Sequence, residues 1–142
     1  MKKLSSIILI DDDSMTTFLN ETIIRDAHCT ENIHVFQTAV KALDFLSQSL
    51  IYDGREKGFE RNSLILLDLH MPPPDGWAFL KEYLLLPETS RKKYTVVILS
   101  SSVEVEDLER AKTISDVSDF YNKPLTHEML MEILNKHFAD HF

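Results

Sequence analysis

The chain has 142 residues, the usual size of one domain, and its hydrophobic fraction of 44% is enough for one substantial core. The net charge of −8, from 15 basic and 23 acidic residues, argues against a nucleic-acid partner, because a phosphate backbone attracts clustered positive charge. The strongest apolar runs are short, so we expect no membrane segment and a cytoplasmic protein. The single cysteine, Cys29, excludes an internal disulfide and fits a reducing compartment, with a small buried thiol as its expected state.

Short apolar runs alternate with longer amphipathic segments in the first half of the chain. Residues 7–10 predict a buried strand, and Ser14 is expected to cap the helix that follows. One face of that helix is largely apolar, as in an amphipathic helix: Met15, Phe18, Leu19, Thr22 and Ile23. Residues 32–37 alternate like a strand. The next helix is expected to turn one apolar set inward: Ala39, Ala42, Leu43, Leu46 and Leu50.

The second half repeats the pattern after a polar loop at 52–62. Residues 63–68 and 94–100 read as strands, and Asp75 is expected to cap a helix between them. A weak acidic helix is predicted over 103–114. A short strand at 117–122 and a final helix then complete the chain, and three leucine or isoleucine side chains of that helix are expected to face inward: Leu130, Ile133 and Leu134.

These segments make five strand–helix units. Strands without polar alternation are typical of a parallel sheet that helices bury on both faces, which defines an α/β fold. The strand at 32–37 alternates more than the others and is expected at an edge of the sheet. In such sheets, ligands bind beyond the carboxyl ends of the strands.

Polar residues follow four of the predicted strands at those ends. Asp11 and Asp12 end the first strand, Asp68 the third and Ser100 the fourth, and Lys123 follows the fifth. Three carboxylates in one pocket cannot all stay ionised without a counter-charge, which a hard cation such as Mg²⁺ supplies. A lysine and a hydroxyl beside the metal are typical of phosphoryl transfer, and a carboxylate can itself be the nucleophile.

The chain resembles the receiver domain of two-component response regulators in four motifs: "DD" at 11–12, "LLDLHMPPPDG" at 66–76, "LSS" at 99–101 and "KP" at 123–124. The resemblance runs from about residue 5 to residue 138. It implies a five-stranded, flavodoxin-like (βα)5 receiver fold for residues 1–142 as a single domain. Because little chain follows the last helix, we expect no output domain.

The resemblance implies that Asp68 is the phospho-acceptor and that Asp11 and Asp12 form the acid pair that holds Mg²⁺. Asp68 is also implied as a metal ligand, and the main-chain carbonyl of His70 as a further one. Asp13 falls outside the acid pair, and we expect it to cap a helix or to be solvated.

The other two motifs imply contacts with the phosphoryl oxygens. Ser100 would hydrogen-bond one oxygen and Lys123 would pair with another. Ser101 is the alternative for the hydroxyl by a register shift of one residue, although the spacing to Lys123 favours Ser100. The bond between Lys123 and Pro124 matches the position where the family uses a cis peptide, and X–Pro bonds adopt cis at low cost.

Three positions are candidates for tuning and switching. His70 and Ser102 would flank the phosphoryl group and set its lifetime, although His70 could equally point to solvent. Phe120 stands three residues before Lys123, where the family has an aromatic switch residue. A core aromatic without a switching role is the alternative reading of Phe120.

The predicted function is a stand-alone, Mg²⁺-dependent switch and not an enzyme. Asp68 would receive phosphate from a phosphohistidine of a sensor histidine kinase or phosphotransfer protein, and the phosphorylated form would bind a downstream protein. A phosphatase of the haloacid dehalogenase type is the main rival, but Met15 stands where its D-x-D-x-T/V pattern needs Thr or Val. An interaction module with a degenerate site is a third reading, disfavoured by the complete residue set. The loop at 52–62 reads as a surface insertion or a partner contact.

Overall fold

A computed structural model describes residues 3–53, 62–101 and 104–139 of the chain. One sheet of five strands runs through the described part. The strands are β1 (Ser6–Ile10), β2 (Ile33–Phe36), β3 (Ser63–Leu67), β4 (Tyr94–Ser100) and β5 (Val117–Asn122). The helices are α1 (Ser14–Ala27), α2 (Ala39–Asp53), α3 (Gly76–Tyr83), α4 (Glu88–Arg91), α5 (Val105–Lys112) and α6 (His127–His137).

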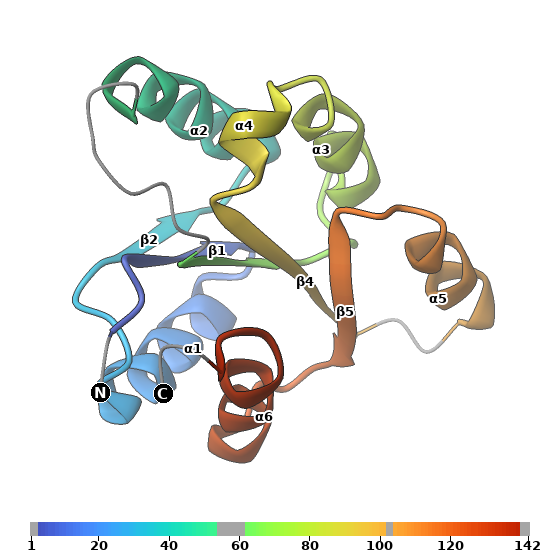
Figure 1. The fold of residues 1–142 in the computed structure, drawn as a ribbon. Coiled ribbons are helices and arrows are strands. Elements are labelled where there is room, and N and C mark those ends of the chain that lie inside the picture. The colour runs from blue at the N-terminus through green and yellow to red at the C-terminus, as the bar shows by residue number, and fades with distance from the viewer. Residues whose placement is uncertain (1–2, 54–61, 102–103, 140–142) are drawn as a thin grey trace.

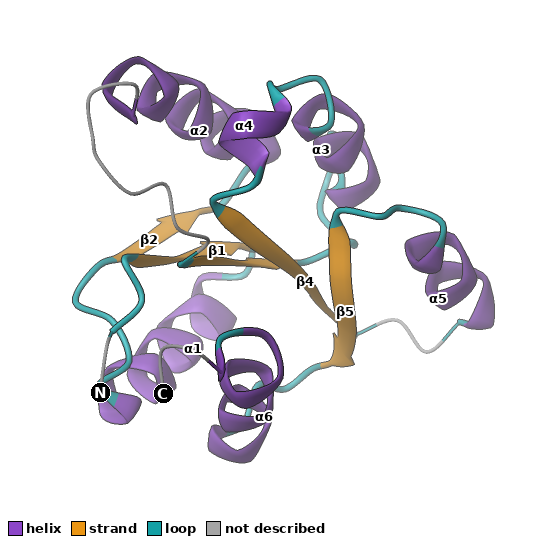
Figure 2. Cartoon of the chain, in the orientation of Figure 1, coloured by secondary structure: helices purple, strands orange, loops and turns teal. Residues whose placement is uncertain are grey.

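All strand pairs are parallel, in the order β2-β1-β3-β4-β5, so the predicted parallel sheet is confirmed, with β2 at one edge. The helices form two layers on the two faces of the sheet (Figures 1 and 2). Helices α2, α3 and α5 cover one face, and α1 and α6 cover the other. Within this topology the carboxyl ends of neighbouring strands share one edge.

Successive residues of the central strands alternate between two apolar cores. On β1, Ile8 and Ile10 pack toward α2 and α3, whereas Ile7 and Leu9 pack toward α1 and α6. Every residue of β3 is buried, and so is all of β4 except its first residue. Burial on both faces explains why these strands lack polar alternation. The free thiol of Cys29 is buried in the second core, as expected.

The N-cap of helix α1 is not Ser14 but Asp13, for which a capping role was also expected. The Asp13 carboxylate accepts a hydrogen bond from the Met15 amide, at 3.1 Å. The apolar face of α1 is largely exposed: Met15, Phe18 and Leu19 are 65%, 64% and 53% exposed, whereas Ile23 packs against the second core. The buried residues of α1 are Thr17, Asn20 and Ile24.

The other predicted elements are present, with one addition. The short helix α4, between α3 and β4, has no counterpart among the expected elements. Asp75 caps α3 as expected, accepting from the Ala78 amide at 2.9 Å, and α6 buries its three predicted side chains. The polar loop falls mostly outside the described residues, and so does the side chain of Leu50. Among the helices described, none has the length and apolar content required to cross a bilayer.

Candidate functional site

Three aspartates meet at the carboxyl edge of the sheet. The Asp11 amide donates to Phe36 O at 3.1 Å and the Asp68 amide donates to Ile10 O at 2.9 Å, so the sheet ladder continues into both residues. Asp11 and Asp68 are buried, and Asp12 is exposed. Their carboxylates offer three oxygen atoms that all lie within 4.8 Å of one another. Hydrogen bonding of the sheet therefore fixes two members of the acidic group.

Lys123 brings a cation to these aspartates from the end of β5. Its amide donates to Ser100 O at 2.9 Å, which sets the turn after the strand. Its ammonium Nζ lies 2.6 Å from Asp11 Oδ2 and 3.4 Å from Asp68 Oδ2, and the side chain is 18% exposed. The Lys123–Pro124 peptide is cis, as expected, and the structure has a second cis peptide at Pro73–Pro74.

Burial and neighbouring charges shift the pKa values of Asp68 and Lys123. Desolvation, and then the neighbouring Asp11 carboxylate, raise the pKa of Asp68 above its ordinary value, although Lys123 opposes this shift. Burial lowers the pKa of Lys123, but its bonds to Asp11 and Asp68 outweigh burial, so the net pKa is raised and the ammonium stays charged at neutral pH. The site therefore holds more negative charge than one lysine neutralises.

The acidic group fits a hard divalent cation. Three carboxylates supply the oxygen ligands that Mg²⁺ prefers, and the exposed Asp12 leaves one side open to water and phosphate oxygens. A bound cation would offset the excess negative charge of the site, and it would favour the ionised form of Asp68, whose pKa is raised. Asp13 lies outside this group, since its carboxylate caps α1 and also accepts from the Thr16 hydroxyl at 2.8 Å.

The remaining predicted residues lie around the same edge. Ser100 ends β4 and is fully buried, whereas Ser101 is exposed. The His70 amide donates to Asp68 Oδ1 at 3.3 Å, while its half-exposed imidazole lies against Asp107 of α5. Phe120 is half-buried against the core that α2 and α3 cover. The predicted tuning residue Ser102 falls outside the described residues.

Gly76, the first residue of α3, is a site residue that the sequence analysis missed. A Cβ added here would lie 2.5 Å from the Asp68 carbonyl oxygen and 2.6 Å from Leu69 Cα. Only glycine allows α3 to begin this close to the backbone of Asp68. The "DG" pair at the end of the 66–76 motif predicts a turn and a helix cap, but the local pattern carries no signal of how closely Gly76 packs against the end of the third strand.

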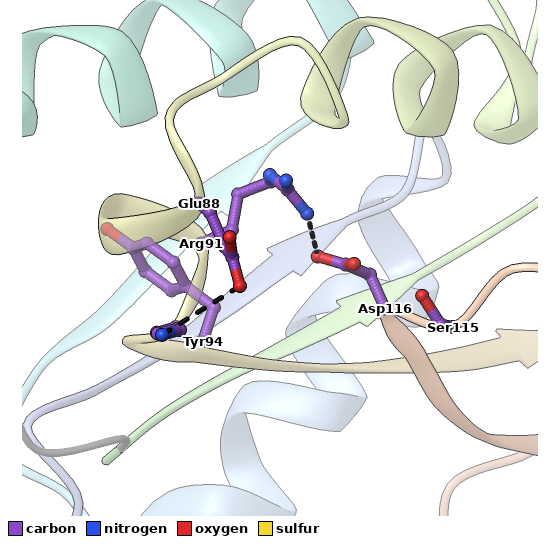
Figure 3. A pocket seen from close by; sticks show the side chains of 6 residues that line it. Glu88, Arg91, Tyr94, Ser115 and Asp116 are labelled. Carbon is purple, nitrogen blue, oxygen red and sulfur yellow. Dashed lines mark hydrogen bonds and ion pairs between the residues drawn. The ribbon is translucent and has the colours of Figure 1, made fainter.

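A polar hollow of about 280 Å³ lies at the opposite end of the sheet from the acidic group, between α4 and the turn before β5 (Figure 3). Six residues line it: Glu88, Arg91, Lys92, Tyr94, Ser115 and Asp116. The Arg91 guanidinium pairs with Asp116 at 2.7 Å, and Lys92 lies 3.8 Å from Glu88. The charges of this hollow thus pair with one another and join α4 to the turn before β5.

Comparison with known proteins identifies the family. The profile of the response regulator receiver domain matches residues 7–135, and the chain belongs to this family. A two-component response regulator from Cytophaga hutchinsonii has the same fold with a TM-score of 0.83 and 33% identity, over 97% of this chain and 99% of that one. A response regulator receiver protein from Dyadobacter fermentans matches with a TM-score of 0.78 and 29% identity, over 94% and 98%. The flavodoxin-like receiver fold is therefore confirmed.

A curated relative, the response regulator Rcp1 of Synechocystis sp., is 28% identical over 72% of this chain. The chain spans less than two thirds of the length of the curated relatives it matches, with 65% and 53% of them covered. The chain is thus the receiver domain of a two-component response regulator, and its acidic group fits a phospho-acceptor aspartate with a divalent metal.

Proposed function

We propose that the protein is a Mg²⁺-dependent switch in which Asp68 accepts a phosphoryl group from a phosphohistidine. One observation carries the proposal: Asp68 is buried beside Asp11 and Lys123, with the Lys123 ammonium bridging the two carboxylates. The donor would be a sensor histidine kinase or a phosphotransfer protein. The family match and the single sheet also support residues 5–138 as one receiver domain.

The transfer step requires the Asp68 carboxylate as nucleophile. One carboxylate oxygen forms a bond to phosphorus while the P–N bond of the phosphohistidine breaks. The electron pair of that bond stays on the imidazole nitrogen, which takes up a proton. The Lys123 ammonium, already 3.4 Å from Asp68 Oδ2, would pair with a phosphoryl oxygen, and the Ser100 hydroxyl would hydrogen-bond another.

Asp11, Asp12 and Asp68, together with the main-chain carbonyl of His70, would hold the metal. Bound Mg²⁺ would neutralise charge on the carboxylates and on the phosphoryl oxygens. Support for a divalent cation comes from the oxygen-only donor set and its excess negative charge. The relative Rcp1 has the same fold in a Mn²⁺-bound form, with a TM-score of 0.69 and 23% identity.

The exposed apolar stripe of α1, formed by Met15, Phe18 and Leu19, is the proposed docking surface for the donor. The stripe begins at Met15, three residues after Asp12 of the acidic group, in the first turn of α1. Exposed contiguous apolar side chains beside a reactive site are typical of a partner contact. Phe18→Ser should lower transfer from a histidine-phosphorylated kinase at least about tenfold. It should leave phosphorylation by phosphoramidate unchanged, and an equal loss with both donors would contradict docking at α1.

Signalling would follow from a shift between two conformations rather than from an enzymatic product. Phosphate on Asp68 would draw Ser100 inward and bias α5, β5 and α6 toward a form that binds a downstream protein in the cytoplasm. Phe120 would act as the switch aromatic, and NMR of its ring with and without phosphate tests this role. His70 and Ser102 would tune the lifetime. Unchanged dephosphorylation in both His70→Asn and Ser102→Ala would contradict that tuning.

Phosphorylation by phosphoramidate, a small donor with a P–N bond, tests the central proposal. Intact mass should show one added phosphoryl group on the wild type with Mg²⁺, and none after EDTA or in Asp68→Asn. Lys123→Met should slow the reaction at least about tenfold, because it removes the cation beside the transferring oxygens. A phosphoryl adduct of equal yield in Asp68→Asn would contradict the assignment of the acceptor.

A further inference from the structure

Helix α5, which follows Ser100 in the chain, has little apolar contact with the rest of the molecule. Ala111 is its one buried residue. The larger apolar side chains Val105 and Leu108 are 69% and 37% exposed. Because hydrophobic stabilisation scales with the apolar area removed from water, packing alone holds α5 more weakly than the other long helices. Polar contacts therefore contribute more to holding α5 in place than they do for the other long helices.

Two polar contacts join α5 to the segment that runs from β3 into α3. His70 Nε2 lies 3.2 Å from Asp107 Oδ2, and because an ionised carboxylate only accepts, the imidazole N–H donates. The guanidinium carbon of Arg110 lies 4.3 Å from the centre of the Trp77 ring, within the range of a cation–π contact. Asp107 and Arg110 stand three residues apart, so both contacts leave α5 from neighbouring positions on its surface.

The main chain of His70 belongs at the same time to the acceptor site. Its amide donates to Asp68 Oδ1, and its carbonyl is the proposed metal ligand. The ring of the same residue contacts α5. A shift of the His70 backbone, when metal and phosphoryl group bind, therefore also moves the His70 ring. The Nε2 atom of that ring is the one that contacts Asp107. Gly76 fixes the start of α3 against the Asp68 backbone, so Trp77 is tied to the same segment.

We propose that the His70–Asp107 contact couples the phospho-acceptor site to α5, with the Trp77–Arg110 contact as a second link. The inference rests on the proposed function, because it needs Asp68 to be the group that is occupied. Occupancy of the site repositions His70, and Asp107 carries this change into α5. Coupling between two sites is reciprocal. If occupancy of the acceptor site changes the affinity of α5 for a partner, binding of that partner changes the affinity of the acceptor site for its ligands by the same factor.

The test uses the full chain with Mg²⁺ and beryllofluoride, and three variants: Asp107→Asn, Asp107→Ala and the charge-matched control Glu109→Gln. Glu109 is exposed on the same helix. Fluorine NMR reports bound beryllofluoride. Amide hydrogen exchange of peptides spanning α5 reports the helix, and emission of Trp77, the single tryptophan, reports the second link. Circular dichroism confirms that each variant is folded.

Beryllofluoride should change α5 exchange by about threefold or more in the wild type and in Glu109→Gln, with a change in Trp77 emission. In Asp107→Asn and in Asp107→Ala, beryllofluoride should still bind, while the α5 response falls to less than half. An undiminished α5 response in both variants would overturn the coupling. Failure of the wild type to bind beryllofluoride would overturn the proposed function itself, and the inference with it.

Discussion

Replacing Gly76 by alanine should damage both stability and phosphorylation. The added Cβ would lie 2.5 Å from the Asp68 carbonyl oxygen and 2.6 Å from Leu69 Cα. Non-bonded carbon atoms prefer separations of about 3.5 Å or more, so one side must yield by about 1 Å. Both atoms are backbone and cannot rotate away. Overpacking of this kind costs about 1–3 kcal/mol, and alanine recovers at most about 1 kcal/mol of helix propensity.

The net expectation for Gly76→Ala is a loss of about 1–2 kcal/mol in the free energy of unfolding, or roughly 3–6 °C in Tm. Urea titration and thermal melts measure it. Because the displaced atoms belong to the acceptor and its neighbour, the rate of phosphorylation by phosphoramidate should fall at least about tenfold.

Ala78→Gly is the matched control, since it exchanges the same two residue types two positions further along α3. It should lose about 1 kcal/mol of stability through helix propensity and phosphorylate at the wild-type rate. Wild-type stability together with wild-type phosphorylation in Gly76→Ala would refute the close-approach argument.

Three further predictions concern charge. Because burial and the Asp11 carboxylate raise the folded-state pKa of Asp68, the stabilisation from its protonated form is present below its ordinary pKa of 3.8 and is lost as pH rises through the folded pKa. Metal-free Asp68→Asn should therefore be more stable than wild type at pH 7 by urea titration, and equal stability would contradict the assigned effects of burial and repulsion. For Asp119, burial raises the pKa, but bonds from Lys136 and His137 outweigh it and lower the pKa below 3.8, so its stabilisation is present above that value and lost below it. Asp119→Asn should be about 1 kcal/mol less stable at pH 6, and the difference should vanish in strong acid. Arg91→Met should cost about 2 kcal/mol, because it leaves a half-buried Asp116 without its partner, while phosphorylation is unchanged.

Much of the site was predictable because a parallel sheet brings strand ends together. Asp11 and Asp68 each follow an apolar run, and this local signal, combined with the topology, places them side by side. Lys123, more than fifty residues after Asp68 in the sequence, lies within 3.4 Å of it. The strands were predictable for the same reason, since burial on both faces requires continuous apolar runs.

The features that the sequence did not predict depend on tertiary contacts or on elements too short to show a pattern. The sequence indicates an apolar face on α1, but the residues of α1 that are buried against the rest of the protein are Thr17, Asn20 and Ile24. The apolar stripe therefore remains exposed. Helix α4 has only four residues, which is too short for helical periodicity to register. The His70–Asp107 contact joins residues 37 positions apart, and neither residue alone carries a signal of it.

Chemical mapping of the phosphorylated residue tests the account most directly. Borohydride reduces an aspartyl phosphate to homoserine, and tandem mass spectrometry then locates the changed residue. After phosphorylation with phosphoramidate and Mg²⁺, we predict homoserine at position 68 alone, and none when EDTA replaces Mg²⁺. Homoserine at Asp11 or Asp12, or a stable phosphoryl adduct that borohydride does not reduce, would contradict Asp68 as the phospho-acceptor.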